Sequence, residues 1–173
     1  TKSVTVSVSN VAPGFNSGTI GSVTEGAASG TAVYTAAASD VSSGTVSYSL
    51  SGTDAGSFTI DVSTGVVTIN AVPDYETKSS YSINVVASDG TSTATLAVTV
   101  SVDDVAPAIS SGAAGGVTEG AAAGTTVYTA AASDVAGGTV SYSLSGADAG
   151  SFSINSSTGV VTINAIPDYE AKS

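Results

Sequence analysis

Short segments of alternating apolar and polar residues recur along the chain, separated by clusters of Gly, Ser and Asp. In residues 46–50, for example, Val46, Tyr48 and Leu50 share one face of an extended strand. Alternation with a period of two predicts β-strands, and Gly, Ser and Asp favour the turns between them. The predicted strands are residues 19–24, 31–38, 45–51, 57–61, 66–70, 80–88 and 93–102.

Two segments between these strands predict tight turns. Ser63-Thr64-Gly65 fits a hairpin turn, in which a glycine can take a positive φ angle. Asp54-Ala55-Gly56 is the one place where we expect a helical turn. Seven short strands in one unit predict an all-β fold, a seven-stranded antiparallel β-sandwich with Greek-key topology.

The chain repeats itself with a period of 94 residues. Residues 14–79 and 108–173 are identical at 50 of 66 positions, and residues 4–8 match residues 98–102 at the same offset. A fixed period of this kind predicts tandem modules arranged end to end. We therefore expect the last strand of a preceding repeat at 1–13, a complete repeat at 14–107 and a truncated second repeat at 108–173.

The second repeat stops before the positions of the last two strands of the complete repeat. The simple interpretation is that the sequence is a segment of a longer array. The alternative is that residues 1–9 of a neighbouring chain supply the last strand by strand addition.

The composition limits the chemistry that the chain can perform. There are 14 Asp and Glu against three Lys and Arg, with a formal net charge of −11 and no Cys or His. The phosphates of a nucleic acid would repel such a chain, so we expect no nucleic-acid partner. The sequence also has no run of roughly 20 apolar residues, so we expect no insertion into a membrane. Without disulfides, a metal ion is the expected means of stiffening a secreted module.

Catalysis has few candidate residues. Without His or Cys the usual nucleophiles and general bases are missing. Asp74 and Glu76 could lie at the separation that a glycosidase needs, but the pair occurs again as Asp168 and Glu170. A catalytic pair repeated in every module of an array is not typical of enzymes, so we expect no enzymatic activity.

Acidic residues concentrate at the ends of the predicted strands. If consecutive sandwiches stack end to end, their carboxylates converge at the junction and repel one another unless a cation lies among them. Calcium prefers such oxygen ligands, whereas zinc and copper favour the His and Cys that are missing here. The candidate calcium ligands are Glu25, Asp74, Glu76, Asp103, Asp104 and Asp134 at the central junction, with Asn10, Asp40, Glu119, Asp168 and Glu170 at the corresponding positions of the others. Asp89, at the end of the predicted strand 80–88, is a further candidate.

Some of these residues have a simpler interpretation. Asp74 and Glu76 could instead cap a loop by accepting backbone N–H groups. Asp54 and Asp148 are interpreted as turn formers and not as ligands.

Four short motifs follow one another in a fixed order. They are Thr-Glu-Gly at 24–26, Asp-Tyr-Glu at 74–76, Ala-Ser-Asp-Gly at 87–90 and Asp-Asp-Val-Ala-Pro at 103–107. Together they resemble the Pro-Glu-Asn, Asp-Arg-Glu, Ala-x-Asp-x-Gly and linker motifs of the cadherin repeat. The run from Gly52 to Phe58, followed by Ser63-Thr64-Gly65, resembles the bacterial cadherin-like repeats of large surface adhesins.

The resemblance implies a cadherin or immunoglobulin-like sandwich with calcium at the repeat junctions and an extracellular location, at the cell surface or secreted. The chain departs from the family pattern at Ser101, Val105 and Ala136, where the family has Asp, Asn and Asp. We therefore expect one or two calcium ions at a junction instead of three.

The predicted function is that of a structural spacer or stalk in a bacterial extracellular adhesin, made rigid by calcium. The alternatives are an adhesive module for glycan or homophilic contact, or a subunit of an extracellular filament. The expected partners are the neighbouring repeats of the same chain.

Overall fold

The computed structural model describes residues 1–41 and 44–170 of the chain. They divide into two compact units, Thr1–Asp104 and Val105–Ser173, which are described separately as unit 1 and unit 2. Residues 171–173 of the predicted second repeat lie outside the described residues. The described residues contain no helix of the length and apolar character needed to cross a lipid bilayer.

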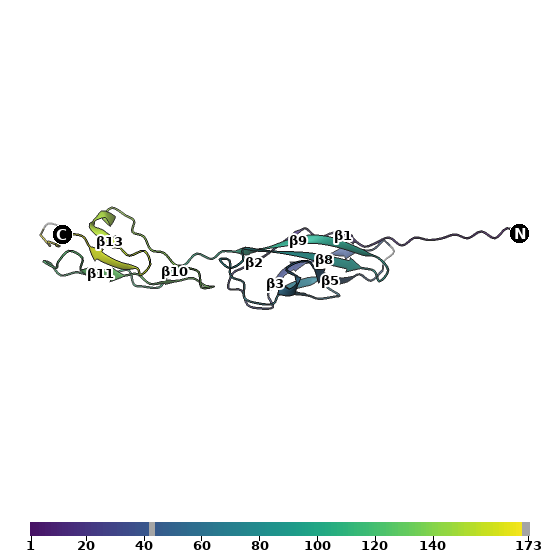
Figure 1. Cartoon of the computed structure of the whole chain (residues 1–173), viewed down its shortest axis with the longest axis horizontal. Coiled ribbons are helices and arrows are strands. Elements are labelled where there is room, and N and C mark those ends of the chain that lie inside the picture. Colours follow the sequence, from purple (N-terminus) through teal and green to yellow (C-terminus); the bar gives the residue numbers. More distant parts are fainter. Residues whose placement is uncertain (42–43, 171–173) are drawn as a thin grey trace. The chain divides into compact units, whose positions relative to one another are not determined.

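Unit 1 is a β-sandwich of two main sheets, and the prediction of an all-β sandwich is confirmed (Figure 1). The larger sheet has the order β2 (Ile20–Thr24), β9 (Thr93–Asp103), β8 (Ser80–Ser88) and β5 (Ser47–Ser51). The second has the order β3 (Ala32–Thr35), β7 (Val66–Ile69) and β6 (Phe58–Ile60). A short pair is formed by β1 (Gly14–Phe15) and β4 (Ala38–Ser39).

The pairing departs from a purely antiparallel sandwich at one place. Strand β2 runs parallel to β9, with Thr24 opposite Asp103, while the other pairs are antiparallel. The predicted strand 31–38 is divided into β3 and β4, because β3 pairs with β7 in one sheet and β4 pairs with β1 in another. Strand β1 was not predicted, because two residues are too short to show alternation.

Both predicted turns are present. The Asp61 carboxylate accepts the N–H groups of Ser63 at 2.9 Å and Thr64 at 2.8 Å, and Gly65 has a φ of 72°. A Cβ at Gly65 would lie 2.5 Å from the Ala36 carbonyl oxygen, so the hairpin requires glycine there. The short 3₁₀ turn η1 (Ala55–Ser57) occupies the expected helical position.

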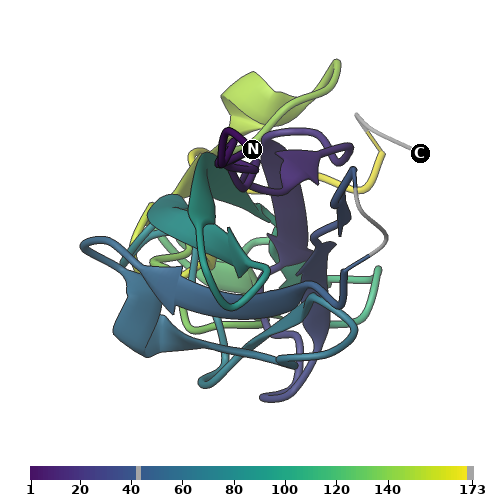
Figure 2. The ribbon, with the colours of Figure 1, turned by 90° about the vertical axis from the view of Figure 1, so that its right-hand side faces the viewer.

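Figure 2 shows the ribbon turned by 90° from the view of Figure 1. The core of unit 1 lies between its two sheets and consists mainly of Val, Ala and Ile. Val67 on one sheet and Val85 and Val100 on the other have no exposed surface. The larger side chain of Tyr48 keeps its hydroxyl paired, because the Ala38 N–H donates to it at 2.9 Å. Strands β8 and β9 supply much of this core, so unit 1 depends on them for its apolar burial.

Unit 2 contains fewer strands. A three-stranded sheet has the order β11 (Thr126–Thr129), β14 (Val160–Ile163) and β13 (Phe152–Ile154), preceded by the 3₁₀ turn η2 (Ala149–Ser151). Strand β10 (Ala108–Ile109) pairs with β12 (Ala132–Ser133). Residues 114–118 and 141–145, which correspond to β2 and β5, form no strand.

Residues 1–13 form no strand either, and Figure 1 draws them as a trace without arrows. Their valines are exposed, at 80% for Val4, 81% for Val6 and 94% for Val8. The strand expected here is therefore absent. The alternation is present, but no strand within the described residues pairs with this segment, and an unpaired strand has no ladder of hydrogen bonds.

Candidate metal site

The parallel pairing of β2 and β9 brings two acidic residues to the same end of unit 1. Glu25 directly follows β2, and Asp104 directly follows β9. Because parallel strands end at the same edge of a sheet, the register that places Thr24 opposite Asp103 also brings the next residues together. The Glu25 N–H extends this contact by donating to the Asp103 carbonyl oxygen at 3.0 Å.

The third acidic residue comes from the loop between β7 and β8. Residues 73–79, called the Glu76 loop below, are fastened to the end of β2 by two hydrogen bonds. Gly26 donates its N–H to the Pro73 carbonyl oxygen at 2.9 Å, and Tyr75 donates its N–H to Oε2 of Glu25 at 3.2 Å. The loop therefore approaches Glu25 with Glu76 at its middle.

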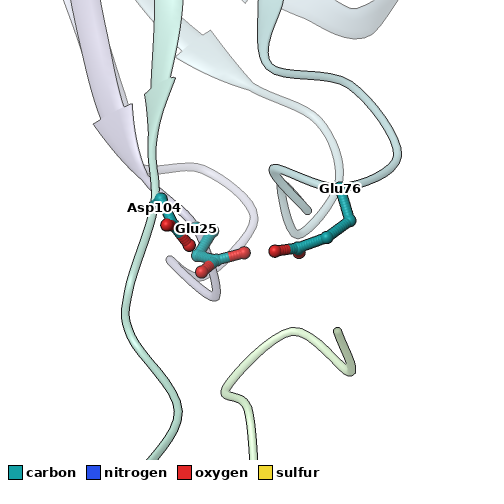
Figure 3. Close-up of side chains that lie close together, drawn as sticks. All are labelled: Glu25, Glu76 and Asp104. Carbon is teal, nitrogen blue, oxygen red and sulfur yellow. The ribbon is translucent and has the colours of Figure 1, made fainter. Parts of the chain in front are cut away.

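The carboxylates of Glu25, Glu76 and Asp104 point toward one another (Figure 3). One oxygen of each lies within 4.8 Å of the others. Glu25 is only 3% exposed, whereas Glu76 and Asp104 are exposed. A buried carboxylate beside two further negative charges is unfavourable in the ionised form unless a cation or hydrogen bonds compensate.

This donor set fits calcium. Its ligands are carboxylate oxygens alone, and calcium accepts six to eight oxygens, completed by carbonyls and water, at flexible geometry. Because the sequence has no His or Cys, the usual ligands of zinc and copper are missing.

Asp74 does not join this cluster. Its carboxylate accepts the Thr77 hydroxyl at 2.7 Å and the Thr77 N–H at 2.9 Å. These bonds lower the pKa of Asp74, the hydroxyl having the larger effect. In this structure Asp74 therefore caps a turn, as the simpler interpretation expects.

Asp103 is also outside the cluster, although it is adjacent to Asp104. Its carboxylate accepts a long hydrogen bond from the Ser101 hydroxyl at 3.4 Å. Its carbonyl oxygen contributes to the site indirectly, by fixing the backbone of Glu25.

Asp89 lies in the hairpin at the opposite end of β9, where Asn10 of the N-terminal segment contacts it. Oδ1 of Asp89 accepts the N–H groups of Thr91 and Ser92, both at 2.7 Å, and Oδ2 accepts the side-chain amide of Asn10 at 2.8 Å. The pKa of Asp89 is lowered, chiefly by the Ser92 N–H and then by Asn10. Asp40 directly follows β4 and is likewise not among the three clustered carboxylates.

Unit 2 has its own cluster, formed by Glu119, Asp168 and Glu170, with carboxylate oxygens within 4.8 Å of one another. All three residues are exposed. Asp134 also belongs to unit 2, where its Oδ1 accepts the Ala136 N–H at 3.2 Å.

Lys78 has no role predicted from the sequence, and Asp54 is predicted to form a turn. In the structure, Lys78 Nζ lies 2.5 Å from Oδ1 of Asp54, and this aspartate makes no side-chain cap of η1. The sequence does indicate a role for this lysine, because the repeat places a lysine at both 78 and 172.

Comparison with known proteins points to one family. Residues 19–103 match the family described as the cadherin domain. A search of curated proteins found no match.

Solved structures give the same result over most of the chain. Human protocadherin-24 EC1-2 is 27% identical, with a TM-score of 0.59, and the match covers 95% of this chain and 82% of that chain. Mouse cadherin-23 EC22-24 is 28% identical with a TM-score of 0.52, covering 91% and 55%. Drosophila N-cadherin EC1-4, at 23% identity, a TM-score of 0.57 and coverage of 94% and 43%, shares the fold.

Proposed function

We propose that this chain, whose residues 19–103 match the cadherin domain and whose structural neighbours are cadherins, is a spacer of an extracellular adhesive protein that calcium makes rigid. Cadherin domains are extracellular adhesion modules without enzymatic activity, and they generally bind calcium. The observation that carries the proposal is the convergence of Glu25, Glu76 and Asp104, with Glu25 almost fully buried.

The position of these residues explains how an ion would stiffen the chain. Asp104 is the last residue of unit 1, so a ligand there fixes the backbone at the unit boundary. Glu25 and Glu76 belong to the body of unit 1. A cation held by all three would connect the boundary to the sandwich and reduce the conformational entropy of the linker.

In unit 2 we propose Glu119, Asp168 and Glu170 as ligands. Glu119 and Glu170 match Glu25 and Glu76, whereas Asp168 matches Asp74 and not Asp104. The other predicted ligands remain predictions: Asn10, Asp40, Asp74, Asp89, Asp103 and Asp134. The count of one or two ions per junction belongs to the same proposal.

The origin from a bacterial surface adhesin also belongs to the proposal. It is supported by the motif from Gly52 to Phe58 and by the 94-residue period. In that setting the partners are neighbouring repeats, and the location is the cell surface or the secreted fraction.

Calorimetric titration and thermal melting in calcium or in chelator test the metal site. Extracellular calcium modules bind with Kd of about 10⁻⁴–10⁻³ M, so about 10 mM calcium should stabilise the chain by about 1.4–2.7 kcal/mol. Glu76→Gln should abolish most of this gain, because it removes a ligand charge. Identical melting of the unsubstituted chain in calcium and in chelator, with no heat of binding, would exclude the proposal.

Asp61→Asn is the matched control, since it also removes one negative charge. The second repeat has Asn155 at this position, and its side-chain oxygen accepts the Ser157 and Thr158 N–H groups, both at 3.0 Å. The substitution therefore preserves the hairpin, and calcium affinity should stay unchanged.

A direct adhesive role is the second candidate. Tyr75 and Tyr169 occupy corresponding loop positions and are 39% and 70% exposed, so their rings are accessible to a ligand. A glycan array and sedimentation of the chain test it. Binding that disappears in a Tyr75→Ala and Tyr169→Ala double variant supports adhesion by the repeats themselves.

A further inference from the structure

Each repeat carries one lysine, and it occupies the same position in both. Lys78 and Lys172 are 94 residues apart, and the only other basic residue of the sequence is Lys2. The aspartate that Lys78 contacts is also repeated, as Asp54 and Asp148. In a chain with a net charge of −11, this lysine is one of few positive charges, and both it and its aspartate partner recur at fixed positions.

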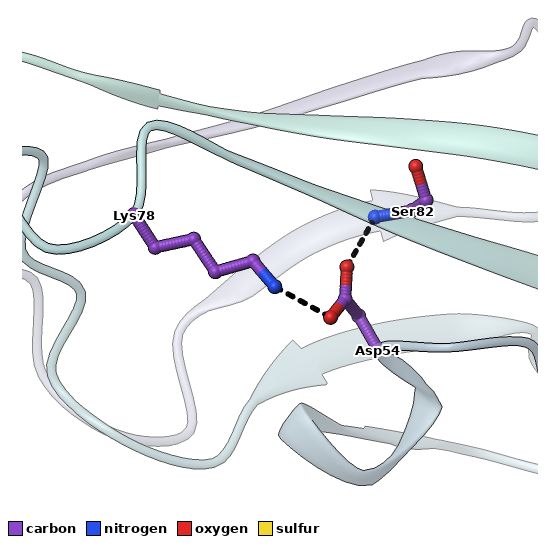
Figure 4. Close-up of polar contacts among 3 residues, drawn as sticks. All are labelled: Asp54, Lys78 and Ser82. Atoms are coloured by element: carbon purple, nitrogen blue, oxygen red, sulfur yellow. Dashed lines mark hydrogen bonds and ion pairs between the residues drawn. The ribbon is translucent and has the colours of Figure 1, made fainter.

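The contact in unit 1 has a defined geometry (Figure 4). Lys78 Nζ lies 2.5 Å from Oδ1 of Asp54, and Oδ2 of the same carboxylate accepts the Ser82 N–H at 2.8 Å. The Asp54 N–H in turn donates to the Ser82 carbonyl oxygen at 3.2 Å. Asp54 is thus fixed to the start of β8 on both its backbone and its side chain.

An aromatic ring completes the environment of the ammonium group. Lys78 Nζ lies 4.8 Å from the centre of the Tyr81 ring, within the range of a cation–π contact. Tyr81 packs edge to face against Phe58, with ring centres 5.2 Å apart and an interplanar angle of 86°.

Exposed ion pairs usually contribute little, because two flexible side chains must be ordered. Here the Asp54 side chain is only 14% exposed and already held by Ser82, although the Lys78 side chain is 42% exposed. The pair therefore has a fixed acceptor, and forming it orders mainly one side chain.

The pair fastens one end of the Glu76 loop. The Lys78 N–H donates to the Asp74 carbonyl oxygen at 2.9 Å, and Thr77 caps the Asp74 carboxylate, so residues 74–78 form one closed turn with Glu76 inside it. The other end of the loop is fastened to Glu25 through the Tyr75 N–H. Between these two attachments the backbone of Glu76 has little freedom.

We propose that Lys78 and Asp54 are positioning residues for the candidate calcium site. By anchoring the Glu76 loop to β8, they keep the Glu76 carboxylate facing Glu25 and Asp104. This inference rests on the proposed function, and neither residue is itself among the three clustered carboxylates.

The decisive variant is Lys78→Met, because charge and positioning predict opposite effects. Removing a positive charge near an acidic site strengthens cation binding by electrostatics alone. Loss of positioning instead weakens calcium binding by about tenfold. This is the low end of the loss in metal affinity when a residue that orients a ligand is removed. Lys2→Met makes the same change in net charge in the exposed N-terminal segment, beyond the end of β9 opposite Asp104, and should leave the calcium Kd unchanged.

The calcium Kd should be measured by calorimetry at a temperature where every variant is folded. We expect about tenfold weaker binding for Lys78→Met and for Asp54→Asn, with no further loss in the double variant, since the two act as one unit. Lys78→Arg should restore most of the affinity. Stability that falls while the Kd stays unchanged, or losses that add in the double variant, would overturn the proposal.

Amide hydrogen exchange in chelator separates this inference from the proposed function. In Lys78→Met the amides of Tyr75, Glu76 and Thr77 should exchange faster, while those of β9 stay unchanged. If the unsubstituted chain binds no calcium, the proposed function fails, and the exchange result alone decides whether the pair holds the loop. Unchanged exchange in the loop would refute the anchoring.

Discussion

Units 1 and 2 share most of their sequence over the matched region but differ in how much of it forms strands and how much of it is buried. Residues 14–79 and 108–173 are identical at 50 of 66 positions. Nevertheless Ser47–Ser51 forms strand β5 in unit 1, whereas residues 141–145, which are identical in sequence, form none in unit 2. The same sequence pattern is therefore a strand in one unit and irregular in the other.

The difference follows from the partners that each segment meets. In unit 1, β2 pairs with β9 and β5 pairs with β8. The described residues of unit 2 include no counterpart of β8 or β9. Strand formation at these positions depends on a non-local partner more than on local propensity.

The cores show the same dependence. Tyr34 and Phe58 are 9% and 5% exposed in unit 1, while the matched Tyr128 and Phe152 are only half-buried. In unit 2 these two rings line an open groove of about 430 Å³. Side chains of β8 and β9 close the core in unit 1.

The acidic clusters differ for the same reason. Glu25 is buried and its N–H is bonded to Asp103 at the end of β9, whereas the matched Glu119 is exposed. A preorganised ligand loses less entropy on binding. We therefore expect the cluster of unit 1 to bind calcium more tightly than the cluster of unit 2.

The largest effect should come from completing unit 2. Appending a copy of residues 80–107 after Ser173 supplies counterparts of β8 and β9. Residues 114–118 and 141–145 should then become protected strands, and the unfolding free energy of unit 2 should rise by about 5 kcal/mol, toward that of a small domain. Amide hydrogen exchange measures both changes.

The control for this experiment keeps the added length but not the added core. An appended copy with aspartate at the positions of Val98, Val100 and Val102 should give no protection, because these side chains are buried in unit 1. Strong protection of residues 114–118 in the unextended chain would contradict the comparison.

Truncating matched aromatic residues should give a smaller and unequal effect. Phe58→Ala should destabilise unit 1 by about 3–5 kcal/mol, because the ring is buried and contacts Tyr81 of β8. Phe152→Ala should cost about 1 kcal/mol, since less apolar surface is buried around its ring. Hydrogen exchange of the slowest amides in each unit measures the loss of unfolding free energy. Equal losses in the two units would contradict the conclusion that the core of unit 2 is less buried.

Much of unit 1 could be predicted from its sequence. Alternation located the seven main strands to within a few residues, because each has one face against the core. The parallel pairing of β2 with β9 could not be predicted, since alternation says which face is buried and not which strand lies alongside. Residues 1–13 show the same limit, as their alternation continues without a strand.

The candidate site could likewise be predicted only in part from the sequence. Motifs pointed to Glu25, Glu76 and Asp104, and the structure brings their carboxylates together, while calcium binding stays a prediction. Asp74 was expected beside them but is bound by Thr77, three residues along the chain. Asp-x-x-Thr is a local capping pattern, so this competing contact was readable from the sequence.

The smallest expected effect concerns the hairpin that begins at Asp61. The N–H groups of Thr64 and Ser63 lower the pKa of Asp61 from its ordinary value of 3.8. Its contribution to stability is therefore complete above the unfolded-state pKa near 3.8 and is lost as pH falls through the lower folded-state pKa. In unit 2 the same bonds are made by Asn155, which does not titrate in this range. Between pH 6 and pH 2 the Thr64 amide resonance should shift while that of Thr158 stays in place, and Asp61→Asn should abolish the Thr64 response. Matching shifts at both threonines would show that the two hairpins differ in more than this one charge.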